Sequence, residues 1–341
     1  MRVLVLGGTA WLGGELAKTA RAHGHEVTCL ARGESGDPPP GVRWVSADRG
    51  ESAAYDDVRD ESWDEVVDVS WQPGLVRSAL DALGERTRHW TYVSSCSVYA
   101  RDDVPGADES AEPHEPLDGD VADWTVYGQA KSACERACAE AVGEKLHVSR
   151  VGLLSGPGDR SDRFGYWPGR FALAAESGAG ADLEAAVLAP DVPEQPTQST
   201  DVRDFAEWLV TGAENGLTGT FNVSGEKTPF GEVLAAARKV AGHDGGLVLA
   251  DPDWLVDQGV DFYMGPESLP LWLHGAEYAG HSARSDAAAV AAGLRRRPLV
   301  ETLVDALAFE RERGLTRERR AGLSREKELD LLRGLAEASR A

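Results

Sequence analysis

The chain has 341 residues, enough for one large domain or two closely associated ones, and its 42% hydrophobic and 27% charged residues are typical of a soluble globular protein. Its formal net charge of −22 repels phosphate backbones and anionic lipid, so we expect neither nucleic acid nor a membrane as partner. The four cysteines lack metal-site spacing and the N-terminal apolar run is too short for a signal peptide, which predicts a cytoplasmic protein with reduced thiols and no metal.

Strands and helices alternate through the first half of the chain. The apolar runs predict strands near residues 2–6, 26–30, 43–46, 65–70, 89–94 and 146–153. Helices are predicted near residues 11–23, 74–85 and 125–142. This order predicts an α/β fold in which a doubly wound parallel sheet, the Rossmann type, binds a nucleotide.

The second half of the chain is less regular. We expect residues 1–158 to form the nucleotide-binding domain and residues 159–341 to be mainly a smaller α/β substrate-binding region. Two strand-like runs near 186–189 and 219–223 flank a helical stretch, so residues 186–224 are expected to return to the nucleotide-binding core. The charged tail from Glu310 is expected to be a surface helix or a frayed end.

A glycine-rich turn, Gly7-Gly8-Thr9-Ala10-Trp11-Leu12-Gly13, follows the first strand. In a strand–turn–helix cofactor site, glycines allow the sharp turn, the approach of a pyrophosphate and close helix packing. Gly7 and Gly13 fit the first and third roles, and Ala10 replaces the second glycine, with Gly8 and Gly14 available to offset its methyl group. The alternative is a turn that closes an ordinary strand–helix unit.

The second strand ends at Ala31-Arg32-Gly33 without a carboxylate. An acidic residue there would hold a ribose 2′-hydroxyl, whereas an Arg accepts a 2′-phosphate, so Arg32 favours NADP(H) over NAD(H). Asp48, after the third strand, is placed to accept from the adenine amino group, or it caps its own turn.

Ser95, Tyr127 and Lys131 are the candidate catalytic residues. A phenol titrates at about pH 10 and is a reluctant acid or base at neutral pH, but a neighbouring ammonium favours the phenolate. Lys131 shares a helix face with Tyr127 and can also reach the cofactor ribose. Ser95 can donate to the oxygen that gains charge during hydride transfer. The alternatives are a solvated lysine, a core tyrosine and a serine cap.

The glycine turn, Ser94-Ser95-Cys96-Ser97-Val98-Tyr99 and Tyr127-Gly128-Gln129-Ala130-Lys131 together resemble the motifs of the extended or atypical short-chain dehydrogenases/reductases, in the NAD-dependent epimerase/dehydratase superfamily. The resemblance implies that Ser95 polarises a carbonyl, that Tyr127 is the general acid/base, and that Lys131 tunes it. It also implies a cofactor-binding set of Gly7, Thr9, Ala10, Trp11, Leu12, Gly13, Arg32, Asp48, Arg49, Val69, Ser70 and Lys131.

Two positions depart from the nucleotide-sugar members of that superfamily. Leu153 stands where those members place an Asn, and Thr197 where they place an Arg that clamps a diphosphate. Their loss removes a charge-assisted grip on a sugar nucleotide, so we expect a neutral, partly apolar or aromatic substrate. The residues expected to line its pocket are Trp71, Ser97, Trp124, Phe164, Tyr166 and Trp167, with core packing as the alternative for each aromatic residue.

These features predict an NAD(P)-dependent oxidoreductase, a carbonyl reductase or alcohol dehydrogenase, acting on a small molecule. An epimerase or dehydratase that retains its NAD, including one acting on a nucleotide sugar, is the alternative enzyme. A non-catalytic RNA-binding relative is the alternative of another class, which the acidic charge and the Ser–Tyr–Lys set disfavour. The resemblance also implies a homodimer through the helix of Tyr127, with Ala133, Ala137 and Ala141 as its small-residue face.

Overall fold

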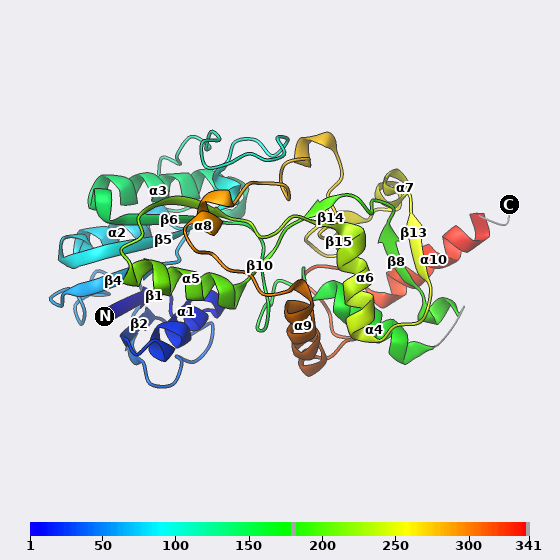
Figure 1. Ribbon diagram of the computed structural model, residues 1–341, viewed down its shortest axis with the longest axis horizontal. Coiled ribbons are helices and arrows are strands. Elements are labelled where there is room, and N and C mark those ends of the chain that lie inside the picture. Colours follow the sequence, from blue (N-terminus) through cyan, green and yellow to red (C-terminus); the bar gives the residue numbers. More distant parts are fainter. Residues whose placement is uncertain (179–181, 339–341) are drawn as a thin grey trace. The chain divides into compact units, whose positions relative to one another are not determined.

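The computed structural model describes residues 1–178 and 182–338, which divide into two compact units (Figure 1). The first unit comprises Met1–Leu153, Val202–Gly225 and Arg284–Arg296, and the second comprises the other described residues. The predicted C-terminal region also includes residues 179–181 and 339–341, which lie outside the described part of the chain. Among the described helices, none combines the length and the apolar character needed to span a bilayer.

The first unit is built on a parallel sheet of seven strands in the order β11-β6-β5-β4-β1-β2-β3. This confirms the predicted doubly wound α/β fold, and the strands differ from their predicted bounds only at the ends. They are β1 (Arg2–Leu6), β2 (Glu26–Ala31), β3 (Arg43–Ser46), β4 (Trp63–Asp68), β5 (Thr87–Ser95), β6 (Leu146–Val151) and β11 (Gly219–Val223).

Helices cover both faces of this sheet. The side chains of β1, which alternate between the two faces, belong to two different cores. Leu4 and Leu6 join the core beneath α2 (Pro73–Leu83) and α3 (Tyr127–Val142). Val3 and Val5 join the core beneath α1 (Trp11–Ala22) and α5 (Val202–Glu214). Because successive side chains of a strand point to opposite faces, a strand covered on both sides is apolar throughout, as β1 is. The short helix α8 (Ala287–Ala291) lies beside β11.

The second unit combines helices with four small two-stranded sheets. Its helices are α4 (Tyr166–Ser177), α6 (Phe230–Ala241), α7 (Pro252–Asp257), α9 (Leu299–Arg313) and α10 (Arg325–Ala338). The strand pairs are β7 (Leu154–Ser155) with β10 (Thr200–Asp201), β8 (Val187–Pro190) with β13 (Leu247–Ala250), β9 (Pro196–Thr197) with β12 (Thr228–Pro229), and β14 (Asp261–Tyr263) with β15 (Ser268–Pro270). Helix α4 packs against α6 and α9.

The expected return of residues 186–224 to the core is only partly what the structure shows. Strand β8 pairs with β13 in the second unit, and the return begins at Val202 with α5 and continues through β11. A further segment, Arg284–Arg296, also belongs to the first unit and was not predicted. An apolar run indicates a buried strand, but it does not indicate which sheet the strand joins.

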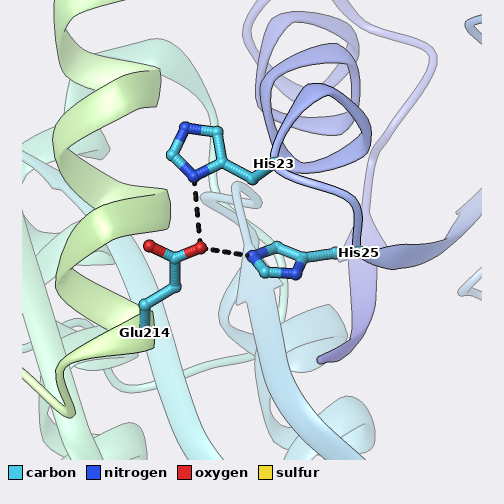
Figure 2. Close-up of side chains that lie close together, drawn as sticks. All are labelled: His23, His25 and Glu214. Atoms are coloured by element: carbon cyan, nitrogen blue, oxygen red, sulfur yellow. Dashed lines mark hydrogen bonds and ion pairs between the residues drawn. The ribbon is translucent and has the colours of Figure 1, made fainter.

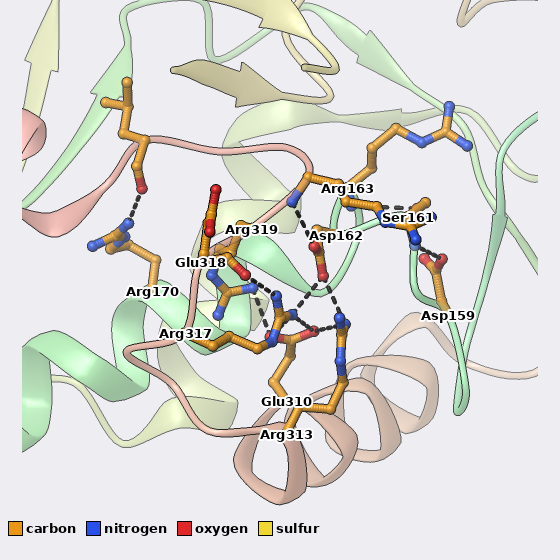
Figure 3. A network of polar contacts seen from close by, with 12 residues as sticks. Asp159, Ser161, Asp162, Arg163, Arg170, Glu310, Arg313, Arg317, Glu318 and Arg319 are labelled. Carbon is orange, nitrogen blue, oxygen red and sulfur yellow. Dashed lines mark hydrogen bonds and ion pairs between the residues drawn. The ribbon is translucent and has the colours of Figure 1, made fainter. Parts of the chain in front are cut away.

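Charged side chains form a network of ion pairs in the second unit, which Figure 3 shows. Asp162 and Glu310 have side chains that are 1% exposed, and Arg313 and Arg317 form ion pairs with both. Arg319 adds a third cation, with Nη1 2.6 Å from Glu310 Oε2. The tail from Glu310 was expected to be a surface helix or a frayed end. This expectation is wrong for the first residues of the tail, because the buried Glu310 carboxylate anchors α9 and the residues that follow.

Candidate active site

A cavity of about 380 Å³ opens in the first unit at the carboxyl ends of the central strands. Its walls include Leu6 from β1, Ala31 from β2, Ala47 after β3 and Val69 after β4. Ligands of open parallel sheets bind at this edge. The predicted cofactor residues that line the cavity are Gly7, Thr9, Ala10, Arg32, Asp48, Arg49, Val69 and Ser70.

The glycine turn has the tight backbone that its sequence indicated. Gly7 adopts a φ of +95°, and a Cβ there would lie 2.7 Å from Val69 Cγ2. A Cβ on Gly13 would lie 2.2 Å from the Gly7 carbonyl oxygen, so only glycine lets α1 pack this closely on the turn. Trp11 and Leu12 are half-buried in the first turn of α1. The backbone N–H groups of such a turn are suited to bind an anion.

The other two glycines of the turn differ in how closely they are packed. A Cβ on Gly8 would lie 2.4 Å from Cys29 Sγ, so Gly8 serves the packing of the turn against β2. A Cβ on Gly14 would make only an ordinary contact at 3.7 Å. Burial raises the pKa of the Cys29 thiol to about 12, which keeps it a packing group.

One cation lies between two carboxylates at the rim of the cavity. Arg32 Nη2 is 3.0 Å from Glu34 Oε2, and its Nη1 is 3.8 Å from Asp48 Oδ2. Glu34 also lines the cavity, one residue beyond the Ala31-Arg32-Gly33 segment that lacks a carboxylate. Asp48 Oδ1 accepts from the Gly50 N–H at 2.9 Å, which is the turn-capping alternative. The charge of Arg32, expected to meet a 2′-phosphate, is thus already compensated.

Arg49 lines the cavity and is held by a buried carboxylate. Its guanidinium donates to both Asp68 oxygens, at 2.8 and 2.6 Å, and to the Leu75 carbonyl at 2.7 Å. Asp68 Oδ1 in turn accepts from the Ser70 N–H at 2.9 Å. Burial acts to lower the pKa of Arg49, but Asp68 outweighs it and the pKa rises. Arg49 therefore positions the turn at Ser70, a role that depends on the unpredicted Asp68.

Lys131 is buried and connects the cavity with the end of β5. Its Nζ donates to the Ser70 carbonyl at 3.0 Å and to the Val93 carbonyl at 2.6 Å. The side chain also lies over the Tyr92 ring, 4.8 Å from its centroid. Lys131 is 3% exposed, so it is not the solvated helix lysine of the alternative interpretation. Among the described residues, these two carbonyls are the hydrogen-bond acceptors of the Lys131 ammonium. An ammonium has three hydrogens, so the third can donate to a ligand.

Gly128 brings the start of α3 against the turn that follows β5. A Cβ on Gly128 would lie 2.3 Å from the Ser97 carbonyl oxygen. Ser95 ends β5, and its Oγ accepts from the Ser97 N–H and donates to Ser97 Oγ, each at 3.1 Å. Tyr127 is the first residue of α3. The fold thus places the Ser95 turn and the Tyr127 turn in contact, while Ser97, predicted to bind substrate, is exposed.

Two of the predicted substrate aromatics gather beside Tyr127. The rings of Trp71 and Trp124 stack with their centroids 4.7 Å apart, and the Tyr127 ring lies 5.4 Å from Trp71 and 5.2 Å from Trp124. Trp71 lines the cavity, whereas Trp124 is 73% exposed. Exposure of so large an aromatic side chain is typical of a binding surface.

The other three predicted aromatics are core residues of the second unit. Phe164, Tyr166 and Trp167 are at most 2% exposed. Trp167 Nε1 donates to the Pro270 carbonyl at 2.8 Å, and its ring meets Tyr166 edge-on at 5.0 Å. For these residues the core-packing alternative describes the structure. Thr197 is also structural, because its hydroxyl donates to the Thr228 carbonyl at 2.8 Å.

No protein-family model and no curated protein matches the chain. Solved structures match it over almost their whole length. UDP-glucose 4-epimerase of Thermus thermophilus, solved in complex with NAD, is 19% identical with a TM-score of 0.62, and the match covers 91% of this chain and 99% of that one. UDP-N-acetylglucosamine 4-epimerase of Bacillus cereus is 16% identical with a TM-score of 0.63, over 94% of this chain and 100% of that one.

A dehydratase structure matches equally well. TunA, an NAD-dependent NDP-hexosamine 5,6-dehydratase involved in tunicamycin biosynthesis, is 17% identical with a TM-score of 0.64, over 92% of this chain and 99% of that one. At these identities the likeness shows the fold. The chain has the fold of the NAD-dependent epimerases and dehydratases among the extended short-chain dehydrogenases/reductases, as the motifs implied.

Proposed function

We propose that the cavity binds NAD(H) and that Ser95, Tyr127 and Lys131 act on a substrate beside it, in an enzyme of the epimerase or dehydratase type that retains its cofactor. The position of Lys131 carries this proposal. Lys131 lies one helical turn after Tyr127. Its ammonium donates both to Ser70, which lines the cavity, and to Val93, near the end of the strand that carries Ser95. A core lysine without a ligand would need no such placement.

The residues of the cavity fit a dinucleotide. The first turn of α1 offers backbone N–H groups to a pyrophosphate, whereas the Gly7 and Ala10 N–H groups already donate to the Leu30 and Gly7 carbonyls. At the rim, a 2′-phosphate would bring its charge beside Glu34 and Asp48, whereas a ribose 2′-hydroxyl can donate to a carboxylate. These two carboxylates are why we propose NAD(H) in place of the NADP(H) that Arg32 alone favoured.

When bound, the cofactor supplies a hydride acceptor and donor. Tyr127 takes the proton of a substrate hydroxyl as that carbon is oxidised, and returns it when the carbonyl is reduced. Ser95 donates a hydrogen bond to the same oxygen and stabilises its developing charge. The Lys131 ammonium donates to the Ser70 and Val93 carbonyls, and its third hydrogen is available to the cofactor ribose.

An epimerase or dehydratase agrees with the names of solved enzymes of this fold, which include two 4-epimerases and one 5,6-dehydratase. Of the two reactions, epimerisation has better support than dehydration, because dehydration also needs an acid beside the tyrosine. Cys96 and Ser97, after the Ser95 position, supply none, and burial raises the pKa of Cys96 to about 11.

Net oxidoreduction of a carbonyl compound is the second candidate. The stack of Trp71, Trp124 and Tyr127 favours it, because it offers a flat apolar surface beside the proposed acid. Leu153 and Thr197 favour it as well, since they lack the polar groups that grip a diphosphate. The two candidates differ in whether the cofactor is consumed.

The cofactor content of the purified protein tests the proposal. We expect denaturation to release one NAD per chain, and the emptied protein to bind NADH more tightly than NADPH. A substrate is first sought by assaying the wild type on sugar nucleotides and on aromatic and alicyclic ketones. Tyr127→Phe should keep its NAD but lose activity on that substrate by about 10²- to 10⁴-fold. Net turnover of added cofactor would select the reductase. Absence of binding to either cofactor, or full activity of Tyr127→Phe, would refute the proposal.

A further inference from the structure

Two histidines and a glutamate converge in the first unit, away from the cavity (Figure 2). His23 follows the last residue of α1, His25 precedes the first residue of β2, and Glu214 is the last residue of α5. The cavity lies at the opposite, carboxyl end of β2. A six-residue strand separates the two places by about 16 Å.

The end of α1 holds both imidazoles in fixed positions. Gly24 adopts a φ of +84°, its N–H donates to the Arg21 carbonyl, and the His25 N–H donates to the Ala20 carbonyl. This pair of bonds is the Schellman motif, in which a left-handed residue ends the helix. The histidines on either side of Gly24 are therefore held by backbone geometry and do not hang from a loose loop.

The donor atoms have the spacing of ligands around one cation. Glu214 Oε1 lies 3.1 Å from His23 Nδ1 and 2.9 Å from His25 Nε2, and the three atoms all lie within 4.8 Å of one another. Ligands at about 2.0–2.1 Å from a tetrahedral zinc are separated by about 3.3 Å. Two imidazoles and one carboxylate form a common zinc-binding set.

The Nε2 atom of His25 is a buried ring nitrogen that no aligned hydrogen bond within the described part of the chain satisfies. Its side chain is 9% exposed, and Nε2 lies close to the Glu214 carboxylate without the alignment of a hydrogen bond to any described residue. A buried ring nitrogen left in this way costs free energy unless another partner satisfies it. A cation between Nε2 and the carboxylate would be such a partner.

The remaining ring nitrogens also have polar neighbours. His23 Nε2 lies 3.1 Å from both oxygens of Glu207, another residue of α5. A carboxylate on the outer nitrogen holds the ring in the tautomer that leaves Nδ1 free to bind a metal. His25 Nδ1 lies 3.2 Å from the Met1 nitrogen, and this nitrogen must be an uncharged amine to accept the Nδ1 hydrogen when Nε2 binds a cation.

We propose that His23 Nδ1, His25 Nε2 and Glu214 bind one divalent transition-metal ion of the zinc class. Imidazole ligands select such ions over magnesium and calcium. Glu214 is 33% exposed in its side chain, which leaves the remaining coordination position to water. The ion would join the end of α5 to the turn between α1 and β2. The cysteine spacing had predicted no metal, but these donors are histidines two residues apart, with a third ligand that only the fold brings near.

Zinc titration of the purified, chelator-treated protein tests the site. We expect one equivalent to bind in isothermal titration calorimetry at physiological salt, with excess magnesium present, and to raise the midpoint of thermal unfolding. His25→Gln and Glu214→Gln should each weaken binding by about tenfold or more and abolish the thermal shift. Glu207→Gln keeps all three ligands and should weaken binding less than either substitution.

His274→Gln is the matched control, because His274 Nε2 also lies 3.1 Å from a carboxylate, Asp253, where the described residues provide no third donor. It should bind zinc like the wild type. If a ligand variant does not fold, the visible spectrum of the wild type with cobalt(II), and its loss on adding zinc, reports the same site. No one-equivalent binding by the wild type, or unchanged binding in both His25→Gln and Glu214→Gln, would overturn the proposal. Cofactor binding is a separate readout that none of these variants should change.

Discussion

At the residue scale, Gly128 determines how closely Tyr127 approaches the turn at Ser97. A Cβ at position 128 would lie 2.3 Å from the Ser97 carbonyl oxygen and 2.7 Å from His114 Cδ2. We expect Gly128→Ala to push the start of α3 outward, to cost about 1–3 kcal/mol in the free energy of unfolding, and to reduce kcat/KM by about tenfold or more. Urea unfolding and steady-state kinetics would measure both effects.

Gly334→Ala provides the control for this substitution. Gly334 lies inside α10, and a Cβ there would meet nothing within 4 Å. Alanine should stabilise that helix by about 0.5–1 kcal/mol and leave kcat/KM unchanged. If Gly128→Ala were as stable and as active as Gly334→Ala, the close approach of α3 would not be needed.

His147 is a buried histidine of β6 that makes stability depend on pH. Burial lowers its pKa to about 4, and its ring stacks on Phe221. In the unfolded chain the His147 imidazole takes up a proton at about pH 6.5. The free energy of unfolding therefore falls as the pH drops from 6.5 to 4, and it rises as the pH increases over the same range. Between pH 7 and 4 the wild type should lose about 2–3 kcal/mol more stability than His147→Gln. Equal losses in urea unfolding at the two pH values would contradict this.

At the element scale, α9 depends on the buried charge of Glu310. Its carboxylate is paired with Arg317 and Arg319 and lies against α4, where a Cβ on Gly165 would come within 2.9 Å of Glu310 Oε1. Glu310→Gln keeps the volume but leaves buried guanidinium groups short of a counter-ion, so we expect a loss of about 3–5 kcal/mol in thermal or urea unfolding.

Glu312→Gln, in the same helix, is the control for this charge. Glu312 is exposed, and its neutralisation should change stability by no more than about 0.5 kcal/mol. Similar effects of the two substitutions would mean that Glu310 contributes only as a surface charge. The sequence could not separate the two glutamates, because both lie in a charged, helix-prone stretch and only packing against α4 buries one of them.

The sequence predicted the helices and strands of the first unit wherever the local residue pattern alone determines the element. Strand β1 is apolar throughout because helices cover both of its faces, and α1 begins directly after the glycine turn. Strand β8 is equally apolar, but it pairs with β13 in the second unit. Burial on both sides gives a strand the same composition in either sheet, so its partner was not predictable from sequence.

At the scale of the whole molecule, each unit is assembled from segments far apart in the chain. The first unit takes α5, β11 and residues Arg284–Arg296 from beyond Asp201, and the last of these was not predicted. Asn222 of β11 shows how that segment is held, since its Nδ2 donates to the Ser285 carbonyl at 2.9 Å. Such pairings leave no local signal in the sequence.

The homodimer remains a prediction at this scale. Of the small-residue face that suggested it, Ala133 is 1% exposed and packs inside the first unit, while Ala141 is exposed. A residue buried within one chain cannot also form a contact between chains, so an α3 interface would have to use the outer residues of the helix.

The sequence by itself determined the parallel sheet, the glycine turn and the catalytic candidates, because each depends on local periodicity, backbone conformation or residue spacing. Only the tertiary structure decided what these residues touch: Asp68 beneath Arg49, the carbonyls of Ser70 and Val93 around Lys131, and Glu214 between two histidines. The physical reason is that a buried charge or ring nitrogen takes its partner from whichever element the fold packs beside it, and that element can lie far away in the chain.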